Sequence, residues 1–341
     1  LIEAIKATQI KYGSTTTISE KKIETEILYN RYDIFKKLFE YYMYASSLMF
    51  LLLIIQIFKD RSKVLHYSVQ TFKYLIWVCF ALHTLGLIAR WYISGHAPWS
   101  DAYESMIYVA WATMAFGVML GKKSDLTFAS TAFVTAMILM IAHWNWMDPS
   151  IGNLQPVLNS YWLMIHVAII VGSYGPLTLG MILGLITLLL MILTNAKNKE
   201  KMALNIKELT IINEMALTVG LVMLTIGNFL GGMWANESWG RYWGWDPKET
   251  WALISIMIYA FVIHMRLIPG LRSRFGFSVA SVVAFGSIMM TYFGVNFYLA
   301  GLHSYAKDDQ EISITYIAAA LISLTFISIL AYRKHKKYFL K

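Results

Sequence analysis

Cysteine and charged side chains are both scarce in this sequence. The one cysteine, Cys79, lies inside an apolar run, so the chain can form neither an internal disulfide nor a Cys-x-x-Cys redox pair. Charged residues make up 14% of the 341 residues, whereas an average soluble domain has about 25%. A soluble domain of this length needs more polar surface to cover its core, so the composition argues against a soluble protein.

Long apolar runs take the place of charge. Hydrophobic residues make up 57% of the chain, and the mean hydropathy is +0.53. About 20 apolar residues span a bilayer as a helix, and continuous rather than alternating runs argue against membrane strands. The candidate spans are 41–58, 74–93, 102–120, 126–142, 162–194, 210–233, 250–265, 277–298 and 312–332. We therefore predict an all-α, polytopic membrane bundle of about nine spans.

Basic residues alternate between the connectors of these spans. One set of connectors, together with the C-terminal tail 333–341, holds 18 Lys and Arg residues, whereas the alternate connectors hold Arg241, Lys248 and Lys307. By the positive-inside rule, the N-terminus and the poorly basic connectors lie outside and the C-terminus lies in the cytoplasm. The net charge of +9 is thus interpreted as a topology signal and not as a sign of nucleic-acid binding.

The segment 234–251, WANESWGRYWGWDPKETW, lies in one of the predicted outer connectors and holds five of the twelve tryptophans. An interfacial aromatic belt is the simpler interpretation, but the glycines between the aromatic residues allow close approach to a flat, apolar ligand. Asp246 and Pro247 predict the cap and first residue of a helix, with Glu249 completing a capping box. The tryptophans are Trp234, Trp239, Trp243, Trp245 and Trp251. We predict that this loop is the working surface of the protein.

Two histidines are predicted at the depth of this loop. His166 lies about one turn into the fifth span, and His303 lies in the last outer connector. Two neutral imidazoles beside an aromatic platform are what bis-histidine haem ligation requires. His264 falls in the inner half of the seventh span, and His83 lies within the second span, where a hydrogen bond to a neighbouring helix is the simpler role. We interpret His83 as a packing or pathway residue.

Other catalytic patterns are missing from the sequence. It contains no glycine-rich phosphate loop, no His-Glu-x-x-His and no cysteine cluster. Asp246 and Glu249 could form an acid–base pair, but three residues apart at a helix start they cap more naturally. No residue is therefore assigned as a nucleophile or a general base.

Several of these segments resemble one known family. WGRYWGWDPKETW (239–251) resembles the tryptophan-rich WWD signature of the haem-handling proteins of cytochrome c biogenesis. RWYISGHAPWSDAYES (90–105), SYWLMIHV followed by GSYG (160–175), and GLHSYA (301–306) resemble the CcsA branch of system II, and the similarity runs through 74–332. Residues 1–40 resemble the external tail, and 41–58 the final span, of the partner protein CcsB. We therefore expect the C-terminal part of a fused CcsBA, ending in the cytoplasmic basic tail 333–341.

The resemblance implies a cytochrome c synthase of the cytoplasmic membrane, which exports haem b and joins it to the Cys-x-x-Cys-His motif of apocytochrome c. Carried over by position, His166 and His303 are the axial ligands of an external haem. His264 is one ligand of an intramembrane haem, with its partner in the CcsB part. Apart from the resemblance, Arg241 and Lys248 are candidates to meet a propionate, and a solvated loop is the equally weighted alternative for both charges. The haem platform is Trp234, Trp239, Trp243, Trp245, Asp246 and Trp251. Apocytochrome c, the CcsB part and thiol-reducing thioredoxin-like proteins are the expected partners.

Three other functions remain open at this point. A haem-delivery protein would present haem without synthase activity. A haem-b electron-transfer subunit would pair histidines within spans, for which His83 and His264 are the candidates. A secondary transporter would show inverted repeats, which we do not see. Covalent haem on a co-expressed apocytochrome distinguishes the synthase from all three.

Overall fold

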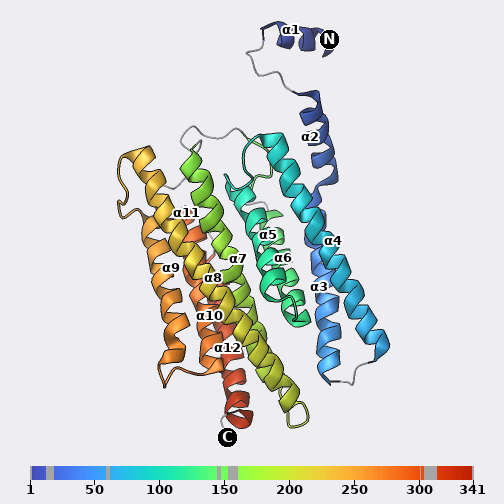
Figure 1. The fold of residues 1–341 in the computed structure, drawn as a ribbon, viewed down its shortest axis with the longest axis vertical. Coiled ribbons are helices and arrows are strands. Elements are labelled where there is room, and N and C mark those ends of the chain that lie inside the picture. Colours follow the sequence, from blue (N-terminus) through green and yellow to red (C-terminus); the bar gives the residue numbers. More distant parts are fainter. Residues whose placement is uncertain are drawn as a thin grey trace.

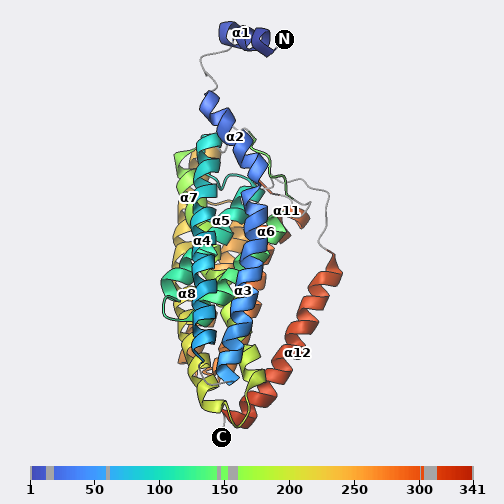
Figure 2. The same cartoon turned by 90° about the vertical axis from the view of Figure 1, so that its right-hand side faces the viewer.

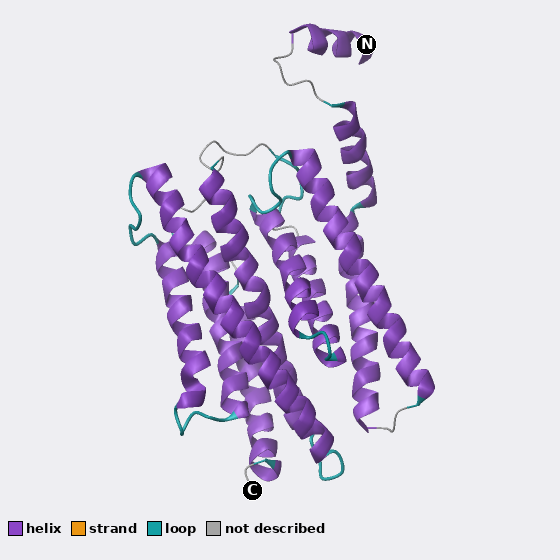
Figure 3. Ribbon diagram, viewed as in Figure 1, coloured by secondary structure: helices purple, strands orange, loops and turns teal. Residues whose placement is uncertain are grey.

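Helices account for every regular element that the computed structural model describes, which covers residues 2–12, 19–58, 62–143, 147–152, 160–299, 301–302 and 313–339 (Figure 1, Figure 3). The elements are α1 (Ile2–Tyr12), α2 (Glu20–Tyr32), α3 (Ile34–Phe58), α4 (Lys63–Ser94), α5 (Ala102–Leu120), α6 (Asp125–His143), α7 (Tyr161–Leu193), α8 (Lys199–Trp239), α9 (Pro247–His264), η2 (Met265–Leu267), α10 (Arg274–Met289), the π-helical η3 (Met290–Gly294), α11 (Val295–Tyr298) and α12 (Ile314–Tyr338). Within this part of the chain, nine helical stretches are long and apolar enough to cross a membrane, which confirms the predicted number of spans.

The helices extend beyond the apolar runs that predicted them. α8 has 41 residues and is therefore about 60 Å long, twice the roughly 30 Å of a hydrocarbon core. It absorbs the first third of the predicted tryptophan-rich loop, so only 240–246 connect α8 to α9. Gly240 ends α8 because it adopts a left-handed conformation (φ 69°), and its N–H donates to the Asn236 carbonyl. The loop is thus shorter than predicted, and α8 and α9 hold both of its ends.

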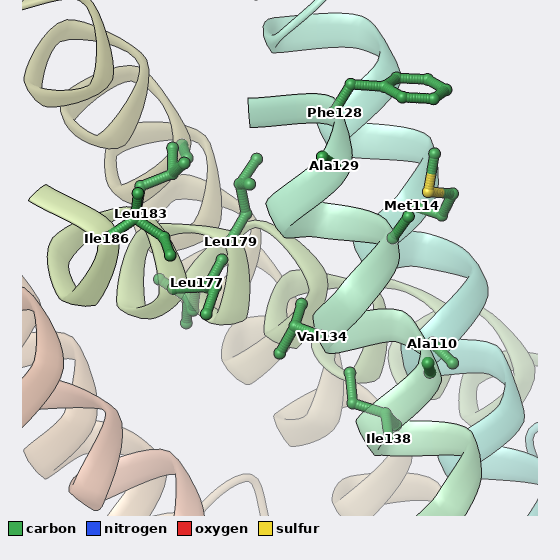
Figure 4. Close-up of a cluster of buried hydrophobic side chains, with 14 of the residues drawn as sticks. Ala110, Met114, Phe128, Ala129, Val134, Ile138, Leu177, Leu179, Leu183 and Ile186 are labelled. Carbon is green, nitrogen blue, oxygen red and sulfur yellow. The ribbon is translucent and has the colours of Figure 1, made fainter. Parts of the chain in front are cut away.

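α7 is the central helix of the bundle and packs against α5, α8, α10 and α12. Its leucines and isoleucines meet small and apolar side chains of α5 and α6 (Figure 4). Gly175 permits a close approach of α7 to α5, because a Cβ there would lie 2.8 Å from the backbone of Ala112 and Thr113. The next residue, Pro176, lies inside the helix, where it removes one backbone hydrogen bond. This buried scaffold carries His166 near the first turn of α7.

The two ends of the chain lie at the margin of the bundle. α1 projects beyond one end, and α2 contacts α4 at that end, where residues 1–40 were expected to form an aqueous tail (Figure 1). α12 leans away from the other helices over most of its length and returns to them near the C-terminus (Figure 2). There the Nζ of Lys334 donates to the Thr194 carbonyl oxygen at 3.2 Å, which ties α12 to the end of α7.

Candidate functional site

A cavity lies at the end of the bundle where α8 joins α9, and its empty volume of about 1270 Å³ includes space open to solvent. The junction of α8 and α9 is at the upper left of Figure 1. The walls come from α5, α7, α8, α9, η3 and α11, so helices distant in the sequence enclose one space. Aromatic and apolar side chains dominate the lining, with a few polar groups between them.

His166 lines this cavity as the sixth residue of α7. Its Nδ1 lies 2.7 Å from the Gly227 carbonyl oxygen on α8. A carbonyl oxygen only accepts hydrogen bonds, so Nδ1 carries the proton and Nε2 carries the lone pair. The ring lies nearly parallel to that of Trp234, with centroids 6.3 Å apart and an interplanar angle of 11°. Histidine ligands of metals are commonly fixed by this kind of hydrogen bond on the second nitrogen.

The backbone of α8 gives His166 the space that it occupies. A Cβ at position 231 would lie 2.6 Å from Cε1 of His166 and 2.9 Å from its Nδ1. Only glycine at position 231 leaves room for the ring in this place. Gly227 and Gly231 are one helical turn apart, so the first supplies the hydrogen-bonding carbonyl and the second supplies the gap.

The five tryptophans of the predicted loop occupy different surroundings. Trp234 is 1% exposed and packs edge-on against Trp239, with centroids 4.7 Å apart. Trp243 also lines the cavity and meets Trp245 edge-on at 5.6 Å. Trp245 is 69% exposed and has a φ of 57°, a left-handed conformation that is costly for a bulky residue. The cavity lining includes Trp234 and Trp243 but not Trp239, Trp245 or Trp251.

The connector between α8 and α9 is held by a capping box, as predicted. Asp246 accepts a hydrogen bond from the Lys248 N–H at 3.1 Å, and Glu249 accepts one from the Asp246 N–H at 3.2 Å. The second Asp246 oxygen, Oδ1, accepts from the Leu302 N–H at 2.6 Å. Asp246 therefore joins the start of α9 to the segment that leads to His303, and His303 itself lies outside the described residues.

Arg241 and Lys248, the two basic residues beside the α8–α9 connector, contact different partners. The Arg241 guanidinium lies over the Trp239 ring, 5.6 Å from its centroid, and 3.4 Å from Glu249. Lys248 lines the cavity, and its Nζ donates to Asn296 Oδ1 at 3.1 Å. Of the two cations considered for an anionic group of a ligand, Lys248 faces the cavity and Arg241 braces the loop.

Comparison with known proteins identifies the family to which this chain and its cavity belong. The family described as Cytochrome C assembly protein matches residues 99–303, a range that contains all of the residues that line the cavity. The chain belongs to this cytochrome c assembly family. It is 46% identical over 315 residues to Protein NrfI of Wolinella succinogenes, which covers 90% of this chain and 34% of that protein. The chain thus spans about a third of the length of that relative.

Shorter relatives agree with this assignment. The chain is 33% identical over 250 residues to the cytochrome c biogenesis protein CcsA of Prochlorococcus marinus strain MIT 9301, covering 66% of this chain and 81% of that protein. It is 34% identical over 274 residues to CcsA of Marchantia polymorpha, covering 67% and 84% respectively. These matches support a role in cytochrome c assembly for the chain.

The remaining predicted histidines of this assembly protein lie away from the cavity. His264 ends α9, about 27 Å along the helix from Asp246, and is exposed on the bundle surface. Its Nδ1 donates to the Ala260 carbonyl oxygen at 2.7 Å. His83 is fully buried, lies 3.1 Å from the Ile107 carbonyl oxygen through Nε2, and packs between the rings of Phe35 and Tyr42. The structure thus gives His83 a packing environment and does not pair it with His264.

The wall of the cavity formed by η3 and α11 was not predicted from the sequence. Tyr292 and Asn296, from η3 and α11, line it, and Tyr292 donates to the Ala102 carbonyl oxygen at 2.9 Å. The π-helical turn 290–294 aims these residues, and such turns are frequent at functional sites. Only their position in an apolar run was visible in the sequence, so nothing distinguished them from packing residues.

A buried arginine supports the same end of the bundle. Arg90 is 0% exposed, and its Nε donates to Glu104 at 2.8 Å. Its two terminal nitrogens donate to the carbonyl oxygens of Pro149 and Ser150 at 2.9 and 3.0 Å. Arg90 thereby joins α4, α5 and the 147–152 segment beside the cavity. A charged residue within a span is a sequence signal for such a role.

Proposed function

We propose that this chain is the haem-handling part of a cytochrome c synthase, which binds haem b in the cavity beside the tryptophan-rich segment. The observation that carries the proposal is the placement of His166. Its Nδ1 donates to the Gly227 carbonyl oxygen, which fixes the ring against α8 at the wall of an aromatic cavity and makes Nε2 the nitrogen that would bind iron. The family to which the chain belongs serves cytochrome c assembly, for which haem is the required substrate.

The residues that line the cavity indicate where the porphyrin would bind. Trp234 and Trp243 supply aromatic faces, and Trp239 and Trp245 pack against them. Asp246 and Trp251, at the start of α9, are proposed as the remaining parts of this platform. His303 is proposed as the second axial ligand, because Asp246 anchors Leu302, the residue directly before it. Lys248 is proposed as the partner of one propionate, since its ammonium lines the cavity and Arg241 is engaged with Glu249.

Attachment of the haem needs no nucleophile from this chain. Each thiol of the Cys-x-x-Cys-His motif of apocytochrome c adds across one haem vinyl group: sulfur bonds to one vinyl carbon, and the thiol proton ends on the other. No electrons are gained or lost in this addition. The contribution of the protein is to orient the vinyl edges and to exclude water. Thioredoxin-like partners would keep the two thiols reduced.

Haem delivery to this cavity is proposed to begin within the membrane. By the positive-inside rule, the basic connectors predict a cytoplasmic C-terminus and a tryptophan-rich segment outside the cytoplasmic membrane. His264 is exposed near the opposite end of α9, as expected for a ligand whose partner comes from another segment. A CcsB part, fused or separate, is the proposed source of that partner.

An absorption spectrum of the purified protein tests the ligand assignment. We expect a b-type haem spectrum that weakens in His166→Gly and in His303→Gly and disappears from the outer site in the double variant. His66→Gly is the control, because His66 is exposed at the start of α4. A spectrum unchanged in all three site variants would show that the ligands are wrong. Haem binding without covalent haem on co-expressed apocytochrome c would instead favour the haem-delivery alternative.

A further inference from the structure

A second hollow lies at the other end of the bundle, between α10 and α12. It has about 1220 Å³ of empty volume and is lined along α10 by Phe275, Val279 and Val283. The α12 wall is formed by Leu321, Leu324, Thr325, Ser328, Ile329, Tyr332, Arg333 and Lys336. α12 leans away from the rest of the bundle over most of its length (Figure 2).

The shape of the groove suits a hydrocarbon chain. The three α10 residues recur every four positions and thus form one continuous apolar ridge. The α12 wall runs from Leu321 to Lys336, about 22 Å along the helix axis. One leaflet of a bilayer contributes about 15 Å of hydrocarbon, half of the full core. The groove is therefore long enough for the acyl chain of a lipid together with its polar end.

The polar end of the groove is positively charged. Arg333 and Lys336 line it on α12, and none of the eleven described lining residues is acidic. The neighbouring Lys334 ties α12 to the end of α7. Basic pockets between membrane helices on the cytoplasmic side bind anionic lipid head groups.

We propose that this groove binds an anionic glycerophospholipid. One acyl chain lies between the α10 and α12 walls, and the phosphate meets Arg333 and Lys336. A helix of another segment would need a matching acidic residue to cover the two cations, whereas an anionic phospholipid supplies charge and hydrocarbon together. The proposal is independent of the haem site, because the groove lies at the opposite end of the bundle.

Native mass spectrometry of the full protein, exchanged into dioleoyl-phosphatidylglycerol or dioleoyl-phosphatidylcholine, tests this assignment. We expect retention of phosphatidylglycerol over phosphatidylcholine by about 30-fold, from two cationic contacts. Arg333→Gln with Lys336→Gln should remove this preference. Lys122→Gln with Lys123→Gln is the matched control, because both lysines are exposed on the short α5–α6 connector and neither lines the groove.

A second variant tests whether lipid retention depends on the apolar groove or on the surface charge of Arg333 and Lys336 alone. Ser328→Phe fills the apolar part and should lower the retention of both lipids while leaving Arg333 and Lys336 in place. Equal retention of the two lipids by the unaltered protein would overturn the proposal. So would unchanged preference in the double variant, or the finding that a protein segment occupies the groove in the full-length protein.

Discussion

Replacing Gly231 with alanine is expected to weaken haem binding without unfolding the protein. The added methyl carbon would lie 2.6 Å from Cε1 of His166, whereas carbon atoms in contact normally lie about 3.5–4.0 Å apart. The ring must therefore move by about 1 Å. The same movement stretches the 2.7 Å hydrogen bond from Nδ1 to the Gly227 carbonyl beyond its normal range.

The magnitude follows from these contacts. Overpacking of this kind costs about 1–3 kcal/mol, and the lost hydrogen bond costs about 1 kcal/mol more. Alanine recovers about 1 kcal/mol over glycine inside a helix, so the free energy of unfolding should fall by no more than about 3 kcal/mol. If the strain is relieved by moving His166 away from iron, haem affinity should fall by about 5- to 150-fold.

The assay combines a haem titration followed by absorption with thermal unfolding of the same samples. Gly286→Ala in α10 is the matched control, because a Cβ there meets nothing within 4 Å. This control should gain helix stability and keep its haem affinity. Normal haem affinity in Gly231→Ala would refute the reasoning that ties His166 to iron through its place against α8.

Three further predictions concern the surroundings of the cavity. Lys248→Met should weaken haem binding by about 10-fold or more, from loss of a charge-assisted contact, but should leave binding of haem dimethyl ester unchanged in the same titration. Arg90→Met should lower the free energy of unfolding by about 3–5 kcal/mol, because the buried Glu104, which is 1% exposed, loses its partner. In the double variant Arg90→Met with Glu104→Gln, part of this free energy should be restored, as measured by unfolding in detergent. Trp245→Asn should change stability by less than about 1 kcal/mol, since asparagine tolerates the left-handed backbone, yet reduce thioether formation on co-expressed apocytochrome c. A large loss of stability there would show that the exposed ring serves folding.

The number of membrane spans and their helical type were predictable from the sequence, because a bilayer-spanning helix needs a continuous apolar run. The helix ends were less predictable. α8 continues through polar residues to Trp239, since backbone hydrogen bonds and tertiary packing extend it beyond its apolar stretch. The capping box at Asp246 was predictable because its residue types and spacing are local.

The candidate site was predictable only in part. His166 and Trp234 were singled out separately, and the structure stacks them beside the cavity. Tyr292 and Asn296 were missed because their place depends on a π-helical turn and on packing between distant helices. The different surroundings of Trp234 and Trp245 could not be predicted either, because burial is set by tertiary contacts that five similar side chains do not reveal.

An experimental structure of the haem-loaded protein tests the central claim most directly. The account predicts iron bonded to Nε2 of His166, with the porphyrin between Trp234, Trp243 and Lys248 in the outer cavity. Haem density elsewhere, with the His166 ring still hydrogen-bonded to Gly227 and Nε2 not bonded to iron, would contradict it.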